Sequence, residues 1–328
     1  MALEDIGFYT LSDERARNIG RNSPLWRCEL ILTERCNFKC LYCRGIREDC
    51  QGDMPLEKAY EIIKFWVNEG LKNIRFSGGE PTVYKHLNTL VAYANALGVE
   101  RIAVSTNGFA SHQYYANLVS SVVNDFSISL DACCSSTGEL MCGGIKKAWE
   151  RVTENIKLLS KLTYVTVGIV ITDDNLRECE NTIRFAHDLG VADIRVISAA
   201  QANMIKTGIS STPIEILNAH PILNYRARNS NNEIPMRGLN EHDCRTCHLV
   251  KDDMAVAGNY HFPCIIYLRE GGKAIGDVGP NMRDERVIWA EAHDCLEDPI
   301  CKNNCLDVCR DFNNTIEKFR EYKTCQIW

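Results

Sequence analysis

The chain has 328 residues, of which 45% are hydrophobic and 24% charged, the ordinary composition of a soluble globular protein. Its net charge of −6 and its lack of a long basic run argue against a surface that binds a nucleic-acid polymer. No apolar stretch approaches the length of a membrane span, and the first residues lack the basic and apolar regions of a signal peptide. We therefore expect a cytoplasmic protein with no membrane partner, acting on a small molecule or a peptide.

From Cys28 onward, segments with strand and helix patterns alternate. Short runs rich in Ile, Val or Phe, as in buried parallel strands, predict strands at 28–33, 73–77, 101–106, 125–130, 164–172 and 193–198. Helical patterns lie between them, for example over 56–70 and 175–190. Six consecutive strand–helix units predict an α/β fold, with a parallel sheet whose ligands meet the carboxyl ends of the strands.

Three cysteines, Cys36, Cys40 and Cys43, lie on one short loop directly after the first predicted strand. A [4Fe–4S] cluster held by three thiolates has one iron without a protein ligand, so a small molecule completes its coordination. Short Cys-x-x-Cys spacings also occur in zinc sites and in thiol exchange. The count of seventeen cysteines is odd and no export signal is present, so metal ligation is a better expectation than disulfides.

The second predicted strand ends in the run Arg75-Phe-Ser-Gly-Gly-Glu-Pro81. Together with the three-cysteine loop, this run resembles the radical S-adenosylmethionine superfamily. The resemblance implies a partial (β/α)6 barrel over 28–200, with S-adenosylmethionine on the open iron. It also implies that Gly78, Gly79 and Glu80 receive the methionine amine, because glycine permits close approach and a carboxylate accepts from an ammonium group. Tyr42 is then expected beside the adenine.

Other candidate contacts to S-adenosylmethionine follow the later strands. The third predicted strand ends in short polar groups that relatives use for ribose hydroxyls and the methionine carboxylate, namely Ser105, Thr106 and Asn107. The alternative is a polar turn around Asn-Gly. Asp131 follows the fourth strand and is either a cofactor contact or a cap on the next segment. On the sixth strand, Val196 or Ile197 is expected to pack on the adenine.

A second field of eight cysteines follows residue 243: Cys244, Cys247, Cys264, Cys295, Cys301, Cys305, Cys309 and Cys325. Its first half resembles the opening of the C-terminal extensions called twitch and SPASM domains, which hold auxiliary [4Fe–4S] clusters, and its second half resembles the closing part of a SPASM domain. Two positions depart from that pattern. Ala292 stands where the usual cysteine precedes Cys295 by three residues, and Cys309 is extra. We therefore expect one or two auxiliary clusters.

Motif position implies two ligand sets. The first consists of Cys244, Cys247, Cys264 and Cys305, and the second of Cys295, Cys301 and Cys325, with Cys309 as a possible fourth. Either set can instead bind zinc through four thiolates. The run Cys244–Cys264 is also similar to the cysteine triad of the molybdenum-cofactor cyclases that act on GTP, but those end in Gly-Gly and this chain ends in Trp328. A cluster with three cysteine ligands would leave one iron open to substrate, whereas a cluster with four would serve electron transfer.

The predicted organisation has four parts: an N-terminal extension over 1–27, the barrel over 28–200, a connector over 201–240 and an auxiliary domain over 241–328. The polar residues of the connector face either substrate or solvent, and they include Gln201, Asn203, Lys206, Arg226 and Arg228. Because only 27 residues precede the first strand, we expect no fused leader-peptide domain. This favours a small molecule, or a peptide delivered by a separate partner.

The resemblance implies that an electron from a flavodoxin- or ferredoxin-type reductant leads to cleavage of S-adenosylmethionine. The resulting 5′-deoxyadenosyl radical takes a hydrogen atom from substrate, and oxidation or cross-linking through an auxiliary cluster follows. An epimerase is the alternative, with a hydrogen-donating thiol among Cys133, Cys134 and Cys142, of which Cys142 is the candidate. Each can equally be a small buried apolar residue. A non-catalytic electron carrier or zinc-stabilised scaffold remains a distant alternative, because a carrier needs no three-cysteine loop beside Gly-Gly-Glu-Pro.

Overall fold

The computed structural model describes residues 13–202 and 208–325, without the side chains of 202 and 321–325. Its contacts divide the chain into two compact units. The first combines Met1–Ile31, Ile46–Ile74 and Arg237–Trp328, and the second combines Leu32–Gly45 and Arg75–Met236. The three-cysteine loop therefore belongs to the second unit, and the C-terminal cysteines belong to the first.

The second unit carries most of the alternating pattern. Its strands are the end of β2 (Asn73–Ser77), β3 (Arg101–Thr106), β4 (Asp125–Ser129), β5 (Tyr164–Ile171) and β6 (Asp193–Ser198). Its α-helices are α3 (Leu87–Ala96), α4 (His112–Ser120), α5 (Ser135–Met141), α6 (Ala148–Leu159), α7 (Cys179–Asp188), α8 (Ile214–Ala219) and α9 (Pro221–Asn231). Short 3₁₀ turns are η4 (Pro81–Val83), η5 (Leu176–Glu178), η6 (Ala200–Ala202) and η7 (Ile209–Ser211).

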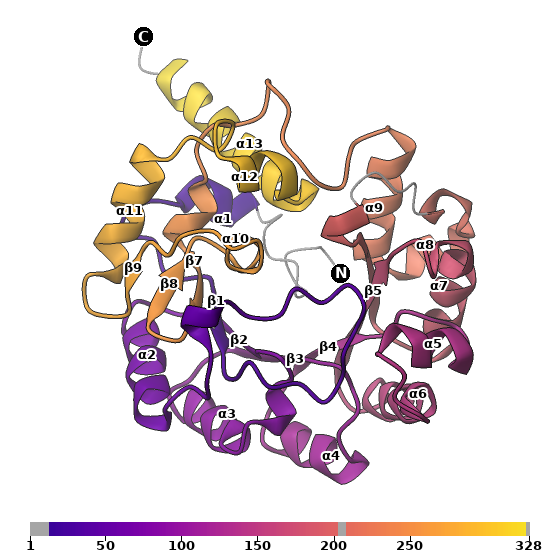
Figure 1. The fold of residues 1–328 in the computed structure, drawn as a ribbon. Helices are drawn as coiled ribbons and strands as arrows, with labels where there is room; N and C mark the ends of the chain where they lie inside the picture. Colours follow the sequence, from indigo (N-terminus) through magenta and orange to yellow (C-terminus); the bar gives the residue numbers. More distant parts are fainter. Residues whose placement is uncertain (1–12, 203–207, 326–328) are drawn as a thin grey trace. The chain divides into compact units, whose positions relative to one another are not determined.

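The strands of this unit follow one another in the sheet in chain order, β2-β3-β4-β5-β6. From β3 to β6 each neighbouring pair is parallel, with Val104 opposite Phe126 and Phe126 opposite Val165. All three side chains are buried, because the helices α3, α4 and α6 lie outside the strands (Figure 1). The carboxyl ends of these parallel strands consequently share one edge.

The six predicted strands are confirmed, with ends that differ by at most two residues. β1 (Arg27–Ile31) is joined to β2 at both ends, by Asn73 N–H to Trp26 O at 3.1 Å and by Leu32 N–H to Ser77 O at 2.8 Å. Among the described strands β6 is the last of the row, so the sheet does not close into a full barrel. The predicted partial (β/α)6 barrel with a cysteine-rich C-terminal region is therefore confirmed.

The first unit is built on β1, which pairs in parallel with β7. β7 and β8, and then β8 and β9, are antiparallel pairs. The elements that follow β1 are η3 (Glu48–Cys50), α2 (Leu56–Asn68), η8 (His248–Lys251), β7 (Asp253–Ala257), β8 (Tyr260–Phe262), α10 (Ile265–Arg269), β9 (Gly276–Asp277), α11 (Met282–Ala292), α12 (Pro299–Asn304) and α13 (Asp307–Cys325). These four strands form one end of the nine-stranded sheet, and the C-terminal cysteines lie on the loops and helices of this unit.

The first and last described helices pack against each other in the first unit. The N-terminal helix α1 (Asp13–Asn18) lies beside α13 (Figure 1). Ala16 and Ile19 share a buried apolar cluster with Phe312 and Ile316 of α13. Burial of such side chains away from water stabilises the contact by about 1.5–3 kcal/mol for each large one. This packing anchors α13, which carries Cys309.

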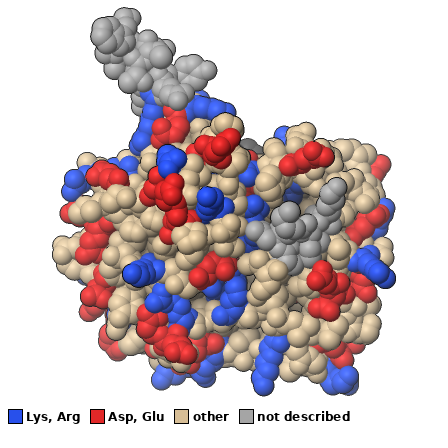
Figure 2. Space-filling model, turned by 45° about the horizontal axis from the view of Figure 1, so that its top comes forward, with Lys and Arg blue, Asp and Glu red and all other residues tan. Residues whose placement is uncertain are grey.

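The surface carries both signs of charge. On the face shown in Figure 2, Lys and Arg residues are interspersed with Asp and Glu residues. Among the described helices, none combines the length and the apolar character needed to cross a bilayer.

Candidate active site

The three-cysteine loop directly follows β1. Cys36 and Cys43 are exposed and Cys40 is half-buried. The Cys36 Sγ accepts a hydrogen bond from the backbone N–H of Phe38, and the Cys43 Sγ accepts one from Gly45, both at 3.4 Å. Backbone N–H groups aimed at sulfur stabilise thiolates and are a feature of iron–sulfur sites. The donor set therefore fits a metal cluster.

The electrostatic surroundings of the three thiols also indicate a metal cluster. Burial, the nearby Asp131 carboxylate and the thiolates of Cys43 and Cys36 raise the pKa of Cys40 to about 12. Three thiolates this close repel one another, so they are stable together when a cation neutralises them. A cluster of positively charged irons supplies that neutralisation.

Gly78 and Gly79 let the end of β2 pack against the start of the loop. The N–H of Gly79 donates to Thr33 O at 2.6 Å, and the N–H of Glu80 donates to Arg35 O at 2.8 Å. A Cβ on Gly78 would lie 2.5 Å from Thr33 O, and one on Gly79 would lie 2.3 Å from Arg35 O. Both are closer than real Cβ contacts, so this approach needs glycine. The glycines thus position the loop, whatever contact to a ligand they also make.

The buried carboxylate of Glu80 links its own turn to the end of β3. Its Oε1 accepts from the N–H of Thr82 at 3.0 Å and from the hydroxyls of Thr82 and Thr106, each at 2.7 Å. Its Oε2 accepts from the N–H of Asn107 at 2.7 Å. Burial raises the pKa of Glu80. Because Oε1 is fully used, only Oε2 has acceptor capacity left for a ligand such as an ammonium group.

Asn107 connects the end of β3 to the cysteine loop. Its Nδ2 donates to Asn37 Oδ1 at 2.6 Å and lies 3.9 Å from the Cys36 Sγ. Its Oδ1 accepts from the N–H of Phe109 at 3.0 Å. The half-buried Ser105 is two residues before it. Of the predicted polar trio, Thr106 and Asn107 are therefore tied into the site's framework, and contact with a ribose or carboxylate stays a prediction.

Asp131 and Tyr42 form a pair at the end of β4. The Tyr42 hydroxyl donates to Asp131 Oδ2 at 2.6 Å, and the N–H of Val170 donates to Oδ1 at 2.7 Å. Loss of hydration raises the pKa of Asp131 to about 6. Asp131 lines a pocket together with Cys40 and Asn107. The structure thus brings Tyr42 and Asp131 together beside the cluster loop, and Tyr42's contact with adenine remains predicted.

Cys142 lies in the same pocket. Its thiol is 6% exposed and donates to Glu139 O at 3.3 Å. Its carbonyl accepts from the N–H of Lys39 at 3.0 Å, and a Cβ on the following Gly143 would lie 2.5 Å from Lys39 O. The end of α5 is therefore hydrogen-bonded to, and packed against, the middle of the cysteine loop.

The other predicted residues of this unit that the structure describes do not line this pocket. Cys133 and Cys134 both face Glu178, at 3.8 and 3.9 Å from its Oε2. Ile197 is half-buried on β6 opposite Val170. In the predicted connector, Gln201 donates to Tyr42 O at 3.2 Å. Arg226 is buried and Arg228 exposed on α9, whereas Asn203 and Lys206 lie outside the described residues.

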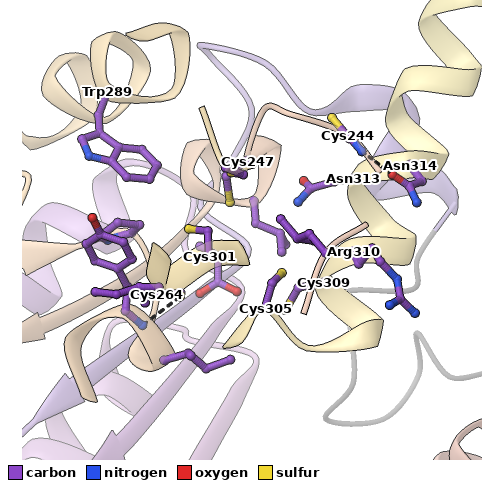
Figure 3. A pocket seen from close by; sticks show the side chains of 18 of the residues that line it. Cys244, Cys247, Cys264, Trp289, Cys301, Cys305, Cys309, Arg310, Asn313 and Asn314 are labelled. Atoms are coloured by element: carbon purple, nitrogen blue, oxygen red, sulfur yellow. Dashed lines mark hydrogen bonds between the residues drawn. The ribbon is translucent and has the colours of Figure 1, made fainter. Parts of the chain in front are cut away.

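In the first unit, seven cysteines line a single pocket (Figure 3). Apolar side chains such as Ile266, Tyr267 and Trp289 form part of its wall. The seven are Cys244, Cys247, Cys264, Cys295, Cys301, Cys305 and Cys309. Cys325 ends α13, but its side chain is outside the described part of the chain.

Four of these thiols, which we call the four-thiol group, are Cys247, Cys264, Cys305 and Cys309; the Cys247 thiolate raises the pKa of each of the other three. Cys247 also forms a side-chain hydrogen bond with Cys295, so the group adjoins Cys295 directly. Burial and the Cys247 thiolate raise the pKa of Cys309 to about 12, against the lowering effect of the Arg27 guanidinium. The Cys264 Sγ accepts from the N–H of Tyr267 at 3.4 Å. Four half-buried thiols with an N–H donor fit a closed cluster or a structural metal ion.

Cys244 lies apart from this group, next to Asn314 (Figure 3). Its N–H donates to Asn314 Oδ1 at 2.8 Å and its thiol donates to Thr246 O at 3.2 Å. Cys247, Cys264 and Cys305 come from the predicted first ligand set and are grouped here with Cys309; which of these cysteines bind a cluster stays a prediction. Motif position could not show this grouping, because α13 alone decides where Cys309 points.

Residues 30–186 match the family model of the radical SAM superfamily. This segment is a radical SAM domain. Among its curated relatives, the GTP 3′,8-cyclase of Helicobacter pylori is 31% identical over 155 residues, 45% of this chain and 48% of that protein. A probable GTP 3′,8-cyclase of Saccharolobus solfataricus is 30% identical over 53% of this chain and 57% of that protein. The chain thus spans about half the length of the curated relatives it matches.

Solved structures resemble the fold over a longer stretch. Streptococcus suis SuiB bound to precursor peptide SuiA has a TM-score of 0.59 at 16% identity, covering 89% of this chain and 69% of that one. Native anSMEcpe with bound AdoMet has a TM-score of 0.60 at 15% identity, covering 92% and 97%. At this identity the likeness concerns the fold alone. The superfamily supports a [4Fe–4S] cluster, S-adenosylmethionine and radical chemistry for this radical SAM chain.

Two residues of the radical SAM chain that the structure places at these sites were absent from the sequence prediction. Asn37 binds the side chain of Asn107 from within the loop. His293 lies beside Cys295 and Cys301. For His293 the sequence offered one signal: the adjacent Ala292 stands where the SPASM pattern has a cysteine.

Proposed function

We propose that this chain is a radical SAM enzyme that abstracts a hydrogen atom from a small-molecule or peptide substrate. When bound at Cys36, Cys40 and Cys43, a [4Fe–4S] cluster with S-adenosylmethionine supplies a 5′-deoxyadenosyl radical after one-electron reduction by a flavodoxin- or ferredoxin-type protein. The observation that carries the proposal is the attachment of the cysteine loop to three strand ends. Glu80 and Asn107 hold it from β2 and β3, and Asp131 holds it from β4.

A radical enzyme needs a cluster loop that is held rigidly, and these attachments hold it. They fix the loop at several points, so the three thiols keep their spacing and the site is preorganised. The remaining acceptor capacity of Glu80 Oε2 and the pocket beside Cys40 and Asp131 are suited to polar groups of the cofactor. We propose that Tyr42, Ser105, Thr106 and Ile197 complete this cofactor site.

We further propose that the four-thiol group holds an auxiliary [4Fe–4S] cluster and that the overall reaction is an oxidation, a cyclisation or a cross-link. A four-thiolate cluster has no open iron and suits electron transfer. The relatives named GTP 3′,8-cyclase make GTP the first small molecule to test, and peptides form the second class.

The test compares wild type with Cys264→Ala after anaerobic reconstitution. We expect the variant to lose about four irons per chain and to keep formation of 5′-deoxyadenosine, because the first cluster is untouched. Product from an accepted substrate should fall about tenfold or more. Cys179→Ala, a buried cysteine of α7, is the matched control and should change neither iron nor product. Unchanged iron in Cys264→Ala would contradict the proposal.

An epimerase is the second candidate, favoured by the position of Cys142 in the pocket with Cys40. Burial raises the pKa of Cys142, so its sulfur keeps the hydrogen that a donor must supply. In deuterated buffer an epimerase would incorporate one solvent deuterium into product, and Cys142→Ala would stop product formation while 5′-deoxyadenosine still forms. Product without deuterium, or normal turnover by Cys142→Ala, would remove this candidate.

A further inference from the structure

Beside the four-thiol group lies a second set of metal-ligating side chains. His293, Cys295 and Cys301 place one imidazole nitrogen and two sulfurs within 4.8 Å of one another. The His293 Nε2 and the Cys301 Sγ are 3.6 Å apart. Cys295 is buried, and the other two are half-buried.

These separations distinguish two kinds of metal centre. Zinc binds sulfur at about 2.3 Å and imidazole nitrogen at about 2.0–2.1 Å in a tetrahedron, which puts the two ligand atoms about 3.6 Å apart. Thiolates on different irons of a cubane are farther apart, because the cluster lies between them. The observed spacing is that of ligands around one ion.

Neighbouring groups hold the three donors in place. The ring of His293 stacks on Trp289, with centroids 3.9 Å apart and an interplanar angle of 17°. Asp298 accepts from the N–H of Cys301 at 2.8 Å, and its other oxygen lies 4.0 Å from the His293 Nε2. Such outer contacts orient metal ligands. The imidazole is thus held by packing on one face, and Asp298 holds the backbone N–H of Cys301.

We propose that His293, Cys295 and Cys301 bind a single divalent ion of the zinc type, next to the four-thiol group. Two thiolates and a neutral imidazole balance the charge of a divalent ion, and water can take the fourth position, as in sites with three protein ligands. This site would stand in place of the second iron–sulfur cluster predicted from motif position. It also accounts for the missing cysteine at Ala292, because His293 supplies the nearby ligand instead.

Metal analysis of the full chain tests the proposal without relying on turnover. Wild type, His293→Ala and His293→Cys are purified anaerobically, reconstituted with iron and sulfide, and analysed for zinc and iron. We expect about one zinc per chain in wild type. His293→Ala should bind zinc about tenfold or more weakly. His293→Cys should retain zinc, and iron should be equal in all three. His242→Ala is the control, because that side chain is 87% exposed.

Cobalt gives a second readout. Co²⁺ at a site with two thiolates and one imidazole absorbs visibly, and the spectrum should weaken in His293→Ala. A wild type without zinc or cobalt binding would overturn the proposal, as would loss of iron in place of zinc from His293→Ala. Formation of 5′-deoxyadenosine should be unchanged in every variant, so failure of this site and failure of the proposed function are distinguishable. Circular dichroism of each variant separates lost metal from lost fold.

Discussion

Replacing Cys36, Cys40 and Cys43 together by Ala should abolish cleavage of S-adenosylmethionine while about four irons per chain remain. All three thiols are on one loop, and no other described cysteine belongs to that loop. We expect the remaining irons at the four-thiol group, whose cysteines belong to the other compact unit. The measurement is iron, labile sulfide and 5′-deoxyadenosine after anaerobic reconstitution and reduction.

Folding should survive this change. Cys36 and Cys43 are exposed and Cys40 is half-buried, so their removal leaves no large cavity. Cys134→Ser, a half-buried cysteine of the same unit outside the loop, is the control and should retain all iron and full cleavage. If the triple variant keeps no iron, the C-terminal cysteines do not hold a cluster, and a redox-neutral reaction becomes the better proposal. If it still cleaves S-adenosylmethionine, the assignment of the loop is wrong.

Replacing Glu80 by Ala should have the largest effect on the second unit. Four donors lose their acceptor at once: the N–H and hydroxyl of Thr82, the hydroxyl of Thr106 and the N–H of Asn107. A buried donor left without a partner costs about 1–3 kcal/mol, so we expect a loss of about 3 kcal/mol or more in the free energy of unfolding. Glu80→Gln should cost less, because its amide oxygen still accepts but its NH₂ group faces the N–H of Asn107.

Two measurements check this prediction. Urea unfolding reports the stability, and hydrogen exchange of a peptide that contains Asn107 reports the lost backbone hydrogen bond directly. Binding of S-adenosylmethionine should weaken in both variants, because Glu80 positions both the loop and the end of β3. Glu154→Gln on α6 is the matched control, since that side chain is 67% exposed and its change should lie within about 0.5 kcal/mol. A Glu80→Ala protein with wild-type stability and exchange would refute the framework role.

Much of the fold was determined by the sequence alone. The six strands follow from short Ile-, Val- and Phe-rich runs, because a parallel strand buried on both faces must be apolar along its length. The three-cysteine loop could also be predicted from the sequence, because its thiols are close together in the chain. Its proximity to Glu80 and Asn107 followed from the shared carboxyl edge of parallel strands. These are properties of local pattern and of a regular topology.

The grouping of the C-terminal cysteines was decided only by the tertiary structure. Cys264 precedes α10 and Cys309 lies on α13, so their meeting depends on how separate elements pack and not on spacing. The same holds for His293, whose ring is set by stacking on Trp289. Likewise the sequence predicted that Gly79 lets the backbone approach a ligand, but in the structure it lets the backbone approach Arg35 O. Side chains brought together by packing across long stretches of chain leave no periodic signal in the sequence, whereas strands and contiguous loops do.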